Sequence, residues 1–273
     1  MSTLRRLALP CFAVFSLAII PHPLLGGTIT FMGDSALVAE LGNSINTGAS
    51  AIAVGQTVII PFSATVTGVQ SVSGEVVLSA SASGGSIQLN NVVFTALGPI
   101  SGPLSFGLSV DQQFEYSRPD TLNLLGTGDG FAHFTGMGPG IQPGDVNTTA
   151  SMKFTPTISP NSDGSSVGSV PFSFNEWAFS DESFPRDADF PTYSRSITGI
   201  SKSTSNPVTL IFEYETMLDP WNTVANEGTS TTLRSAALGF TGTPAAVPEP
   251  ASLALIGVGM AGALIFARRR RAA

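Results

Sequence analysis

The sequence predicts an all-β protein: an antiparallel β-sandwich or jelly-roll-like domain, with a signal-peptide helix before it and a transmembrane helix after it. Short stretches of alternating apolar and polar residues recur along the central part of the chain, each bounded by turn-forming residues. No stretch of a dozen residues there shows helical spacing of apolar side chains without a Gly or Pro inside it. The central part has roughly 220 residues, a size at which sandwiches and barrels form single domains.

The beginning of the chain has the pattern of a secretory signal peptide. Two arginines precede an uncharged stretch, residues 7–20, and a Pro-His-Pro sequence then interrupts it. This order of a basic, an apolar and a helix-breaking region is typical of signal peptides. We expect residues 1–27 to be the signal peptide, with cleavage near Gly26 or Gly27. Retention as an N-terminal anchor is the alternative, because two leucines stand where small residues are preferred.

The one cysteine of the chain, Cys11, lies within this segment. The exported chain would therefore contain no thiol. A disulfide framework, a catalytic cysteine and a thiolate metal site are all excluded for it, so its stability must come from a packed core.

The exported part is strongly acidic. Six of the twelve basic residues lie in the two terminal segments, and eighteen of the nineteen acidic residues lie between those segments, which leaves a net charge of −12. Such a surface repels nucleic acids and anionic lipids. We therefore expect no nucleic-acid partner.

The central domain is expected to consist of short antiparallel strands. Val208, Leu210, Phe212 and Tyr214 alternate with polar residues, as in a strand with one buried face. The strands that we expect within the domain, residues 28–243, are residues 57–67, 74–82, 86–97, 104–110, 151–155, 208–216 and 231–241.

Turns, loops and one irregular strand are expected between these strands. Phe172 and Phe174 share a parity that Trp177 and Phe179 break, so we expect a bulge in a strand there. Turn residues and Pro-rich sequences predict turns or loops at residues 84–85, 136–144, 161–164 and 180–191.

Residues 244–273 have the pattern of a membrane anchor. Residues 251–267 carry no charge, and seventeen helical residues span roughly 26 Å, the short end of what crosses a bilayer core. A single C-terminal transmembrane helix is expected here, with the domain outside the cytoplasm. The residues that would stop the helix on the cytoplasmic side, because they are costly to translocate, are Arg268, Arg269, Arg270 and Arg271.

Just before the apolar stretch stand Pro248, Glu249 and Pro250. This motif, followed by an apolar helix and a basic tail, resembles the PEP-CTERM sorting signal of Gram-negative bacteria, over residues 247–273. The resemblance implies recognition by an exosortase, a membrane-embedded cysteine transpeptidase that would cut near the motif and pass the protein to the cell surface or an exopolysaccharide matrix. Two prolines also keep the motif extended, so that an enzyme can grip it. An ordinary tail anchor with a proline-bearing stalk is the alternative.

The strongest catalytic resemblance lies where a predicted first strand runs into Gly33, Asp34 and Ser35. This sequence is similar to the first block of the GDSL (SGNH) hydrolases, in which the Ser is the nucleophile. The family's Gly-x-Asn-Asp block and its Asp-x-x-His, whose His serves as the base, are both absent. Without a base a Ser is a weak nucleophile. We therefore expect a turn after the first strand and no enzymatic activity, with an esterase acting through Ser35 as the third hypothesis.

A histidine and an acidic loop are the next candidates. His133 lies between aromatic residues and is expected to be a packing or surface residue, not a metal ligand or a base. Asp181, Glu182, Asp187 and Asp189 crowd one loop and could bind Ca²⁺, but they match no EF-hand spacing, and a solvated acidic loop is expected.

Two tryptophans complete the candidates. Trp177 and Trp221 could stack on sugar rings, although core or edge packing is the favoured interpretation. We assign no catalytic, cofactor or metal site. The leading hypothesis is a non-catalytic structural or adhesive protein of the cell surface or matrix, with an exosortase and the membrane as partners and exopolysaccharide as a further candidate. The alternative is a carbohydrate-binding surface module.

Overall fold

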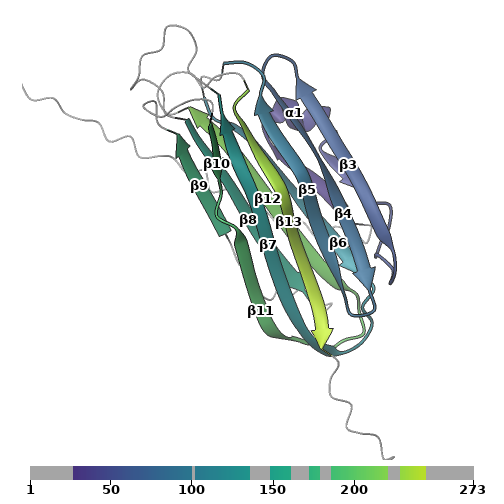
Figure 1. Ribbon diagram of the computed structural model, residues 1–273. Coiled ribbons are helices and arrows are strands. Elements are labelled where there is room, and N and C mark those ends of the chain that lie inside the picture. Colours follow the sequence, from purple (N-terminus) through teal and green to yellow (C-terminus); the bar gives the residue numbers. More distant parts are fainter. Residues whose placement is uncertain are drawn as a thin grey trace, which may run out of the picture.

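The computed structural model describes residues 27–99, 102–135, 148–160, 172–178, 186–220 and 228–243. Two antiparallel sheets face each other across one hydrophobic core (Figure 1). The predicted signal-peptide helix and the predicted transmembrane helix lie outside the described ranges. Within those ranges no helix is both long enough and apolar enough to cross a membrane.

The first sheet has six strands, and a short helix, α1 (Ser35–Glu40), follows its strand β1. In spatial order the strands are β2 (Ser44–Asn46), β1 (Thr28–Gly33), β6 (Leu104–Phe114), β12 (Val208–Pro220), β8 (Thr148–Ser159) and β9 (Phe172–Ala178).

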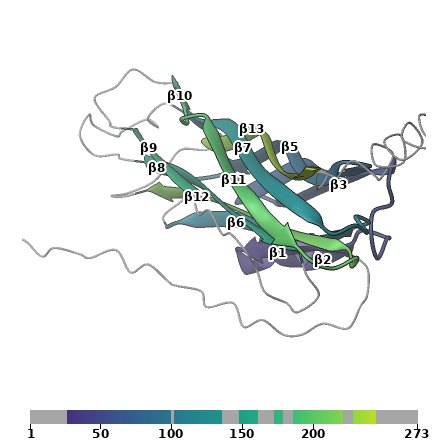
Figure 2. The same ribbon diagram turned by 90° about the horizontal axis from the view of Figure 1, so that it is seen from below.

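The second sheet has seven strands. Six of them are, in spatial order, β10 (Arg186–Asp189), β7 (Asp120–Phe134), β13 (Ser230–Thr243), β5 (Gly84–Ala96), β4 (Gln70–Ser81) and β3 (Thr57–Val66). The seventh, β11 (Tyr193–Lys202), lies end to end with β10 along the same edge of β7. Figure 2 shows the two sheets as separate layers.

All seven expected strands are present, which confirms the all-β, sandwich-like prediction. They correspond to β3, β4, β5, β6, β8, β12 and β13, several of which extend beyond the predicted bounds. In β12 the side chains of Val208, Leu210, Phe212 and Tyr214 are buried, as the alternation indicated.

Strand β7, the longest at fifteen residues, was not predicted. Its sequence contains Gly126, Gly128 and Gly130, which are typical of a loop. In the structure a Cβ at Gly128 would stand 3.0 Å from Cε2 of Phe154, and a Cβ at Gly130 would stand 3.0 Å from the sulfur of Met152. Gly128 and Gly130 therefore make room on the inner face of β7 for large side chains from the opposite sheet.

Three local predictions are wrong. Gly84 and Gly85 belong to β5, and the turn before it consists of residues 82–83. Part of the predicted loop at residues 180–191 forms β10, because its backbone pairs with β7. The register of β9 runs without a shift from Phe172 to Ala178, so the expected bulge is absent within that strand; Phe179 lies outside the described residues.

A chain of aromatic rings joins the two sheets in the core. The ring of Phe62 in β3 lies 5.6 Å from that of Phe31 and 6.0 Å from that of Phe106, both in the opposite sheet. From Phe106 the contacts continue to Tyr214 at 6.5 Å and from there to Phe154 at 5.6 Å. Truncating such a buried ring to Ala costs about 3–5 kcal/mol, so this chain is a main source of stability in a domain without disulfides.

The strands run along one common direction, so the sandwich has two ends. We call the end at Thr243 the exit end, because β13 leaves the sheet there. The register places Thr243 opposite Thr121 and Thr241 opposite Gly84. The turn between β4 and β5, the beginning of β7 and the last residue of β11, Lys202, therefore lie at the same end (Figure 1).

Candidate functional sites

A buried polar cluster lies at the exit end. The side chain of Asp120, the first residue of β7, is 1% exposed. The hydroxyl of Tyr116 donates a hydrogen bond of 2.7 Å to Oδ2 of Asp120. Nε of Arg118 lies 3.0 Å from the Tyr116 oxygen and 3.1 Å from Asp120 Oδ2, and its guanidinium covers the Tyr116 ring at 5.1 Å. The connection between β6 and β7 is therefore fastened by its own side chains.

A buried lysine completes this cluster. Lys202 lies opposite Asp120 in the register of β11 on β7, and its Nζ donates to the carbonyl of Thr204. Burial lowers the pKa of Lys202, and the negative charge of Asp120 opposes that shift. Burial and the hydrogen bond to Asp120 both raise the pKa of Tyr116. Arg118 and Lys202 both offset the negative charge of Asp120. The cluster therefore suits a structural role, in which it holds this end of the sandwich together, better than acid–base chemistry.

A shallow depression of about 200 Å³ adjoins the cluster. It is smaller than the roughly 300–1,000 Å³ of ordinary ligand pockets, so it is too small to enclose a metabolite. The residues that line it are Val54, Ala82, Glu115, Tyr116, Ser117 and Arg118.

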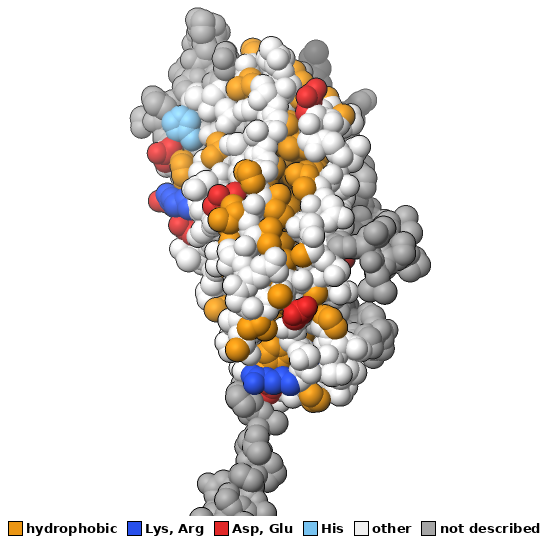
Figure 3. Space-filling view, turned by 90° about the vertical axis from the view of Figure 1, so that its right-hand side faces the viewer, with side chains coloured by type: hydrophobic (Ala, Val, Ile, Leu, Met, Phe, Trp, Pro, Cys, Tyr) orange, Lys and Arg blue, Asp and Glu red, His pale blue; other side chains and the backbone are white. Residues whose placement is uncertain are grey.

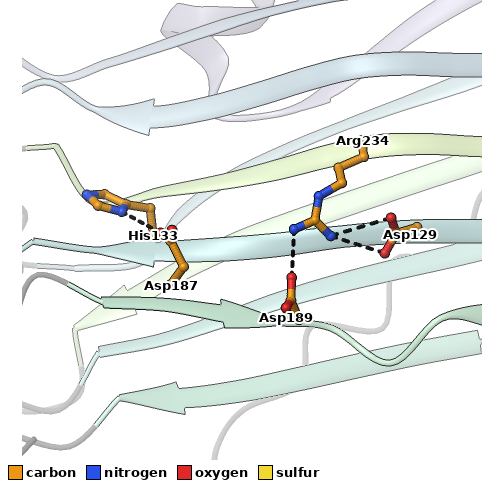
Figure 4. A network of polar contacts seen from close by, with 5 residues as sticks. All are labelled: Asp129, His133, Asp187, Asp189 and Arg234. Carbon is orange, nitrogen blue, oxygen red and sulfur yellow. Dashed lines mark hydrogen bonds and ion pairs between the residues drawn. The ribbon is translucent and has the colours of Figure 1, made fainter.

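A second polar cluster lies on the outer face of the seven-stranded sheet (Figure 4). Arg234 stands at a register shift in β13. Its Nη1 lies 3.2 Å from Oδ1 of Asp129, its Nη2 lies 2.7 Å from Oδ1 of Asp189, and its guanidinium covers the ring of Phe131 at 4.7 Å. One cation therefore ties together three neighbouring strands, β13, β7 and β10.

His133 makes the neighbouring contact in the same view. Its Nδ1 lies 2.7 Å from Oδ1 of Asp187, and both side chains are more than a third exposed. Exposed pairs of this kind contribute about 0–1 kcal/mol each. With the Arg234 pairs, this contact fastens the four-residue strand β10 to β7.

These positions correct the expectation of a solvated acidic loop in part. Asp187 and Asp189 lie on β10 and pair with His133 and Arg234, while Asp181 and Glu182 fall outside the described residues. In the part of the chain that the structure describes, no three His, Cys, Asp or Glu side chains are grouped as a metal site would require.

The Gly-Asp-Ser sequence begins a helix. Oδ1 of Asp34 accepts hydrogen bonds from the backbone N–H groups of Ala36 at 2.9 Å and Leu37 at 3.4 Å, so Asp34 is the N-cap of α1 and Ser35 its first residue. This corrects the expected turn after the first strand, since a capped helix follows β1 directly. His133, the candidate base, lies on the opposite sheet and is paired with Asp187.

Several candidates fall outside what the structure describes. Trp177 belongs to β9, where it lies opposite Thr149, but its side chain is not among the described ones. The residues wholly outside the described ranges are Trp221, the sorting motif Pro248, Glu249 and Pro250, and the arginines Arg268, Arg269, Arg270 and Arg271.

Tyr116, Arg118, Asp120 and Lys202 were not predicted as a cluster. Strand pairing brings Lys202 to Asp120 from a segment far along the chain, which no local pattern shows. One signal was available: the domain has six basic residues, and two of them belong to this cluster.

Comparisons with known proteins identify one segment of the chain. Residues 246–271 match the family model described as the PEP-CTERM protein-sorting motif. A search of curated proteins finds no match. The motif implies an exported protein that an exosortase processes and that this segment anchors in the membrane beforehand.

Two solved structures are distantly similar to this chain. One, TmCBM61 in complex with beta-1,4-galactotriose, has 11% identity and a TM-score of 0.21, over 54% of this chain and 68% of that chain. Another, the enzymatically active domain of Bacteriophage CBA120 tailspike protein 4, has 10% identity and a TM-score of 0.20, over 79% of this chain and 19% of that chain. At these TM-scores neither likeness carries an argument about fold or ligand.

Proposed function

We propose that the exported domain is a non-catalytic structural or adhesive protein of the cell surface or matrix, and that it adheres to neutral polysaccharide through the outer face of the seven-stranded sheet. The observation that supports this proposal is the chemistry of that face. Along β3, β4, β5, β7 and β13 it is broad, rich in hydroxyl and amide groups, and poor in charge.

Small polar side chains cross this face from strand to strand. The hydroxyls of Ser79 and Ser86 lie 2.9 Å apart on β4 and β5, and Nδ2 of Asn90 donates to Oε1 of Glu75 at 3.1 Å. Hydroxyls and amides both donate and accept hydrogen bonds, as sugar hydroxyls do. The outward-facing residues of this kind on β4, β5, β7 and β13 include Ser71, Ser73, Ser79, Ser86, Gln88, Asn90, Thr95, Thr127, Ser235 and Thr241.

Apolar side chains lie between the polar ones. Ile59 on β3 is 60% exposed and Leu125 on β7 is 50% exposed. Figure 3 shows apolar side chains running down the middle of one side of the molecule, with single charged side chains scattered among and beside them. Apolar groups of this kind can contact the C–H faces of sugar rings.

The charges of this part of the face are few, and each has a polar partner. Along β3, β4, β5, β7 and β13 its charged side chains are Glu75, Asp129 and Arg234, and each has a polar partner described above. The outer face of the other sheet differs, because Glu213 and Glu215 lie side by side there with Lys153. A neutral polymer loses less solvation on the less charged surface that β3, β4, β5, β7 and β13 form.

A pair of matched substitutions tests the proposal. Thr127→Lys places a cation on β7 in the proposed face, and Thr155→Lys places one on β8 in the other sheet. We expect Thr127→Lys to weaken binding to the neutral exopolysaccharide of the producing cells by at least about tenfold, or 1.4 kcal/mol, and Thr155→Lys to leave it unchanged. No binding by the unaltered protein, or equal effects of both changes, would refute the proposal. Carbohydrate binding through Trp177 or Trp221 stays a prediction.

A further inference from the structure

The chain reaches the sorting motif from a central strand. β13 ends at Thr243, and the matched motif begins at residue 246, so two residues separate them. β13 lies between β7 and β5 in the seven-stranded sheet (Figure 1). Any pull on the anchored segment therefore acts first on the end of a central strand.

β13 is paired on both sides along nearly its whole length. On β7 its partners run from His133, opposite Ser230, to Thr121, opposite Thr243. On β5 they run from Thr95 to Gly84. The hydrogen bonds of an antiparallel pair are perpendicular to the strands. A pull along β13 therefore strains the bonds of both ladders together, in shear.

The contacts of the last residues of β13 resist fraying of this strand at the exit end. The N–H of Gly242 donates to the carbonyl of Ser83 at 2.7 Å, and Gly242 packs against Tyr116 and Asp120. Further along the strand, Leu233, Leu238 and Phe240 are buried in the core. The pull is thus opposed by pairing, by core packing and by the buried cluster.

An edge strand would not behave in this way. β10 has four residues and β3 has ten, and each pairs with one neighbour in the described sheet. A chain leaving from either edge and pulled along the strand would be held by the hydrogen bonds of one ladder instead of two.

We propose a mechanical function for β13: it carries tension, in shear, between the adhesive face of the sandwich and the membrane for as long as residues 246–271 anchor the chain, before an exosortase processes it. This inference rests on the proposed adhesive function for the source of the tension. The resistance of the strand is a property of the fold and can be measured independently of any ligand.

Single-molecule pulling on the full chain in detergent tests this function. Cys11→Ser removes the native thiol, and two new thiols carry the handles. Ala245→Cys with Val69→Cys pulls β13 along its length, because Val69 lies in the β3–β4 turn at the far end. Ala245→Cys with Ser83→Cys pulls β13 and β5 apart from their adjacent ends, which unzips the pair.

We expect the rupture force in the first geometry to exceed that in the second by about twofold or more, since forced unfolding follows the barrier along the direction of the pull. Equal forces, or a lower force along the strand, would overturn the proposal. Gly242→Ala should lower the force along the strand and Gly239→Ala should not. Failure of polysaccharide binding would remove the adhesive function but would leave this comparison of forces unaffected.

Discussion

Gly242 lies so close to the phenol of Tyr116 that a Cβ at position 242 would stand 1.5 Å from the Tyr116 oxygen and 2.8 Å from Oδ2 of Asp120. Real Cβ atoms do not approach other atoms so closely, so any side chain there must displace the buried cluster. The end of β13 and the connection between β6 and β7 are therefore packed as one unit at the point where the chain leaves the sandwich.

This contact predicts the effect of a single methyl group. Gly242→Ala should lower the free energy of unfolding by about 1–3 kcal/mol, the usual cost of overpacking. Gly239→Ala on the same strand is the control, because its Cβ would have its nearest neighbours at 3.5 Å. Denaturant unfolding of both variants checks the prediction, and equal stabilities would contradict it.

The buried carboxylate of Asp120 predicts a second difference. Asp120→Asn removes the buried negative charge that pairs with Arg118 and that favours the charged form of the buried Lys202. Breaking such a pair costs about 3–5 kcal/mol. Asp129→Asn, whose carboxylate is 38% exposed, should cost about 1 kcal/mol or less. Thermal unfolding at pH 7 would show a clear separation between the two; similar melting temperatures would count against a buried charge network.

The three tyrosines of the chain predict the response to alkali. Burial raises the pKa of Tyr116, Tyr193 and Tyr214 above the ordinary value of 10.0. A folded-state pKa above the unfolded one adds stability that is fully present below pH 10 and is lost as the pH rises beyond 10. Phenolate absorbance should therefore appear only above pH 10 and together with unfolding. A tyrosine that ionises near pH 10 in the folded protein would contradict this account.

The half-buried carboxylate of Glu213 predicts a stabilising change. Burial, and then repulsion from Glu215, raise the pKa of Glu213 above its ordinary value. The ionised form therefore costs stability above the folded-state pKa, and this cost disappears below pH 4.5. Glu213→Gln should add up to about 1 kcal/mol at pH 7, because solvent screens the charge of a half-exposed side chain, and nothing at pH 3.5.

Glu215→Gln serves as the control for that change. It removes the carboxylate that pairs with Lys153 at 3.1 Å, so its gain at pH 7 should be smaller. Urea unfolding at the two pH values measures both variants. A loss of stability in Glu213→Gln at pH 7 would show that its charge is not a cost.

Alternation of apolar and polar residues was sufficient to predict the strands that have one buried and one solvated face. Strand β12 is the clearest case, because each of its four alternating apolar residues is buried. Strand β7 escaped prediction for a tertiary reason: Gly128 leaves space for Phe154, a residue of the opposite sheet. Glycine signals a loop locally, and only the packed sandwich shows why a strand needs it there.

The polar clusters could not be predicted from local sequence for a related reason. Lys202 meets Asp120, and Asp189 meets Arg234, through strand pairing between segments distant along the chain. Likewise, the Gly-Asp-Ser sequence resembles a catalytic block. In the structure its Asp34, directly after β1, is instead the N-cap of a helix. By contrast, the sorting motif is contiguous in sequence, and a family match at residues 246–271 confirms it.

Deletion of residues 251–273 tests the central claim most directly, because the account places the sandwich outside the cytoplasm and attributes its attachment to this segment. Antibody against the domain, applied to cell fractions and culture medium, measures where the chain resides. The full chain should stay with the cell envelope or matrix, and the shortened chain should appear folded in the medium. A shortened chain that stays in the envelope, or a domain found in the cytoplasm, would contradict the account.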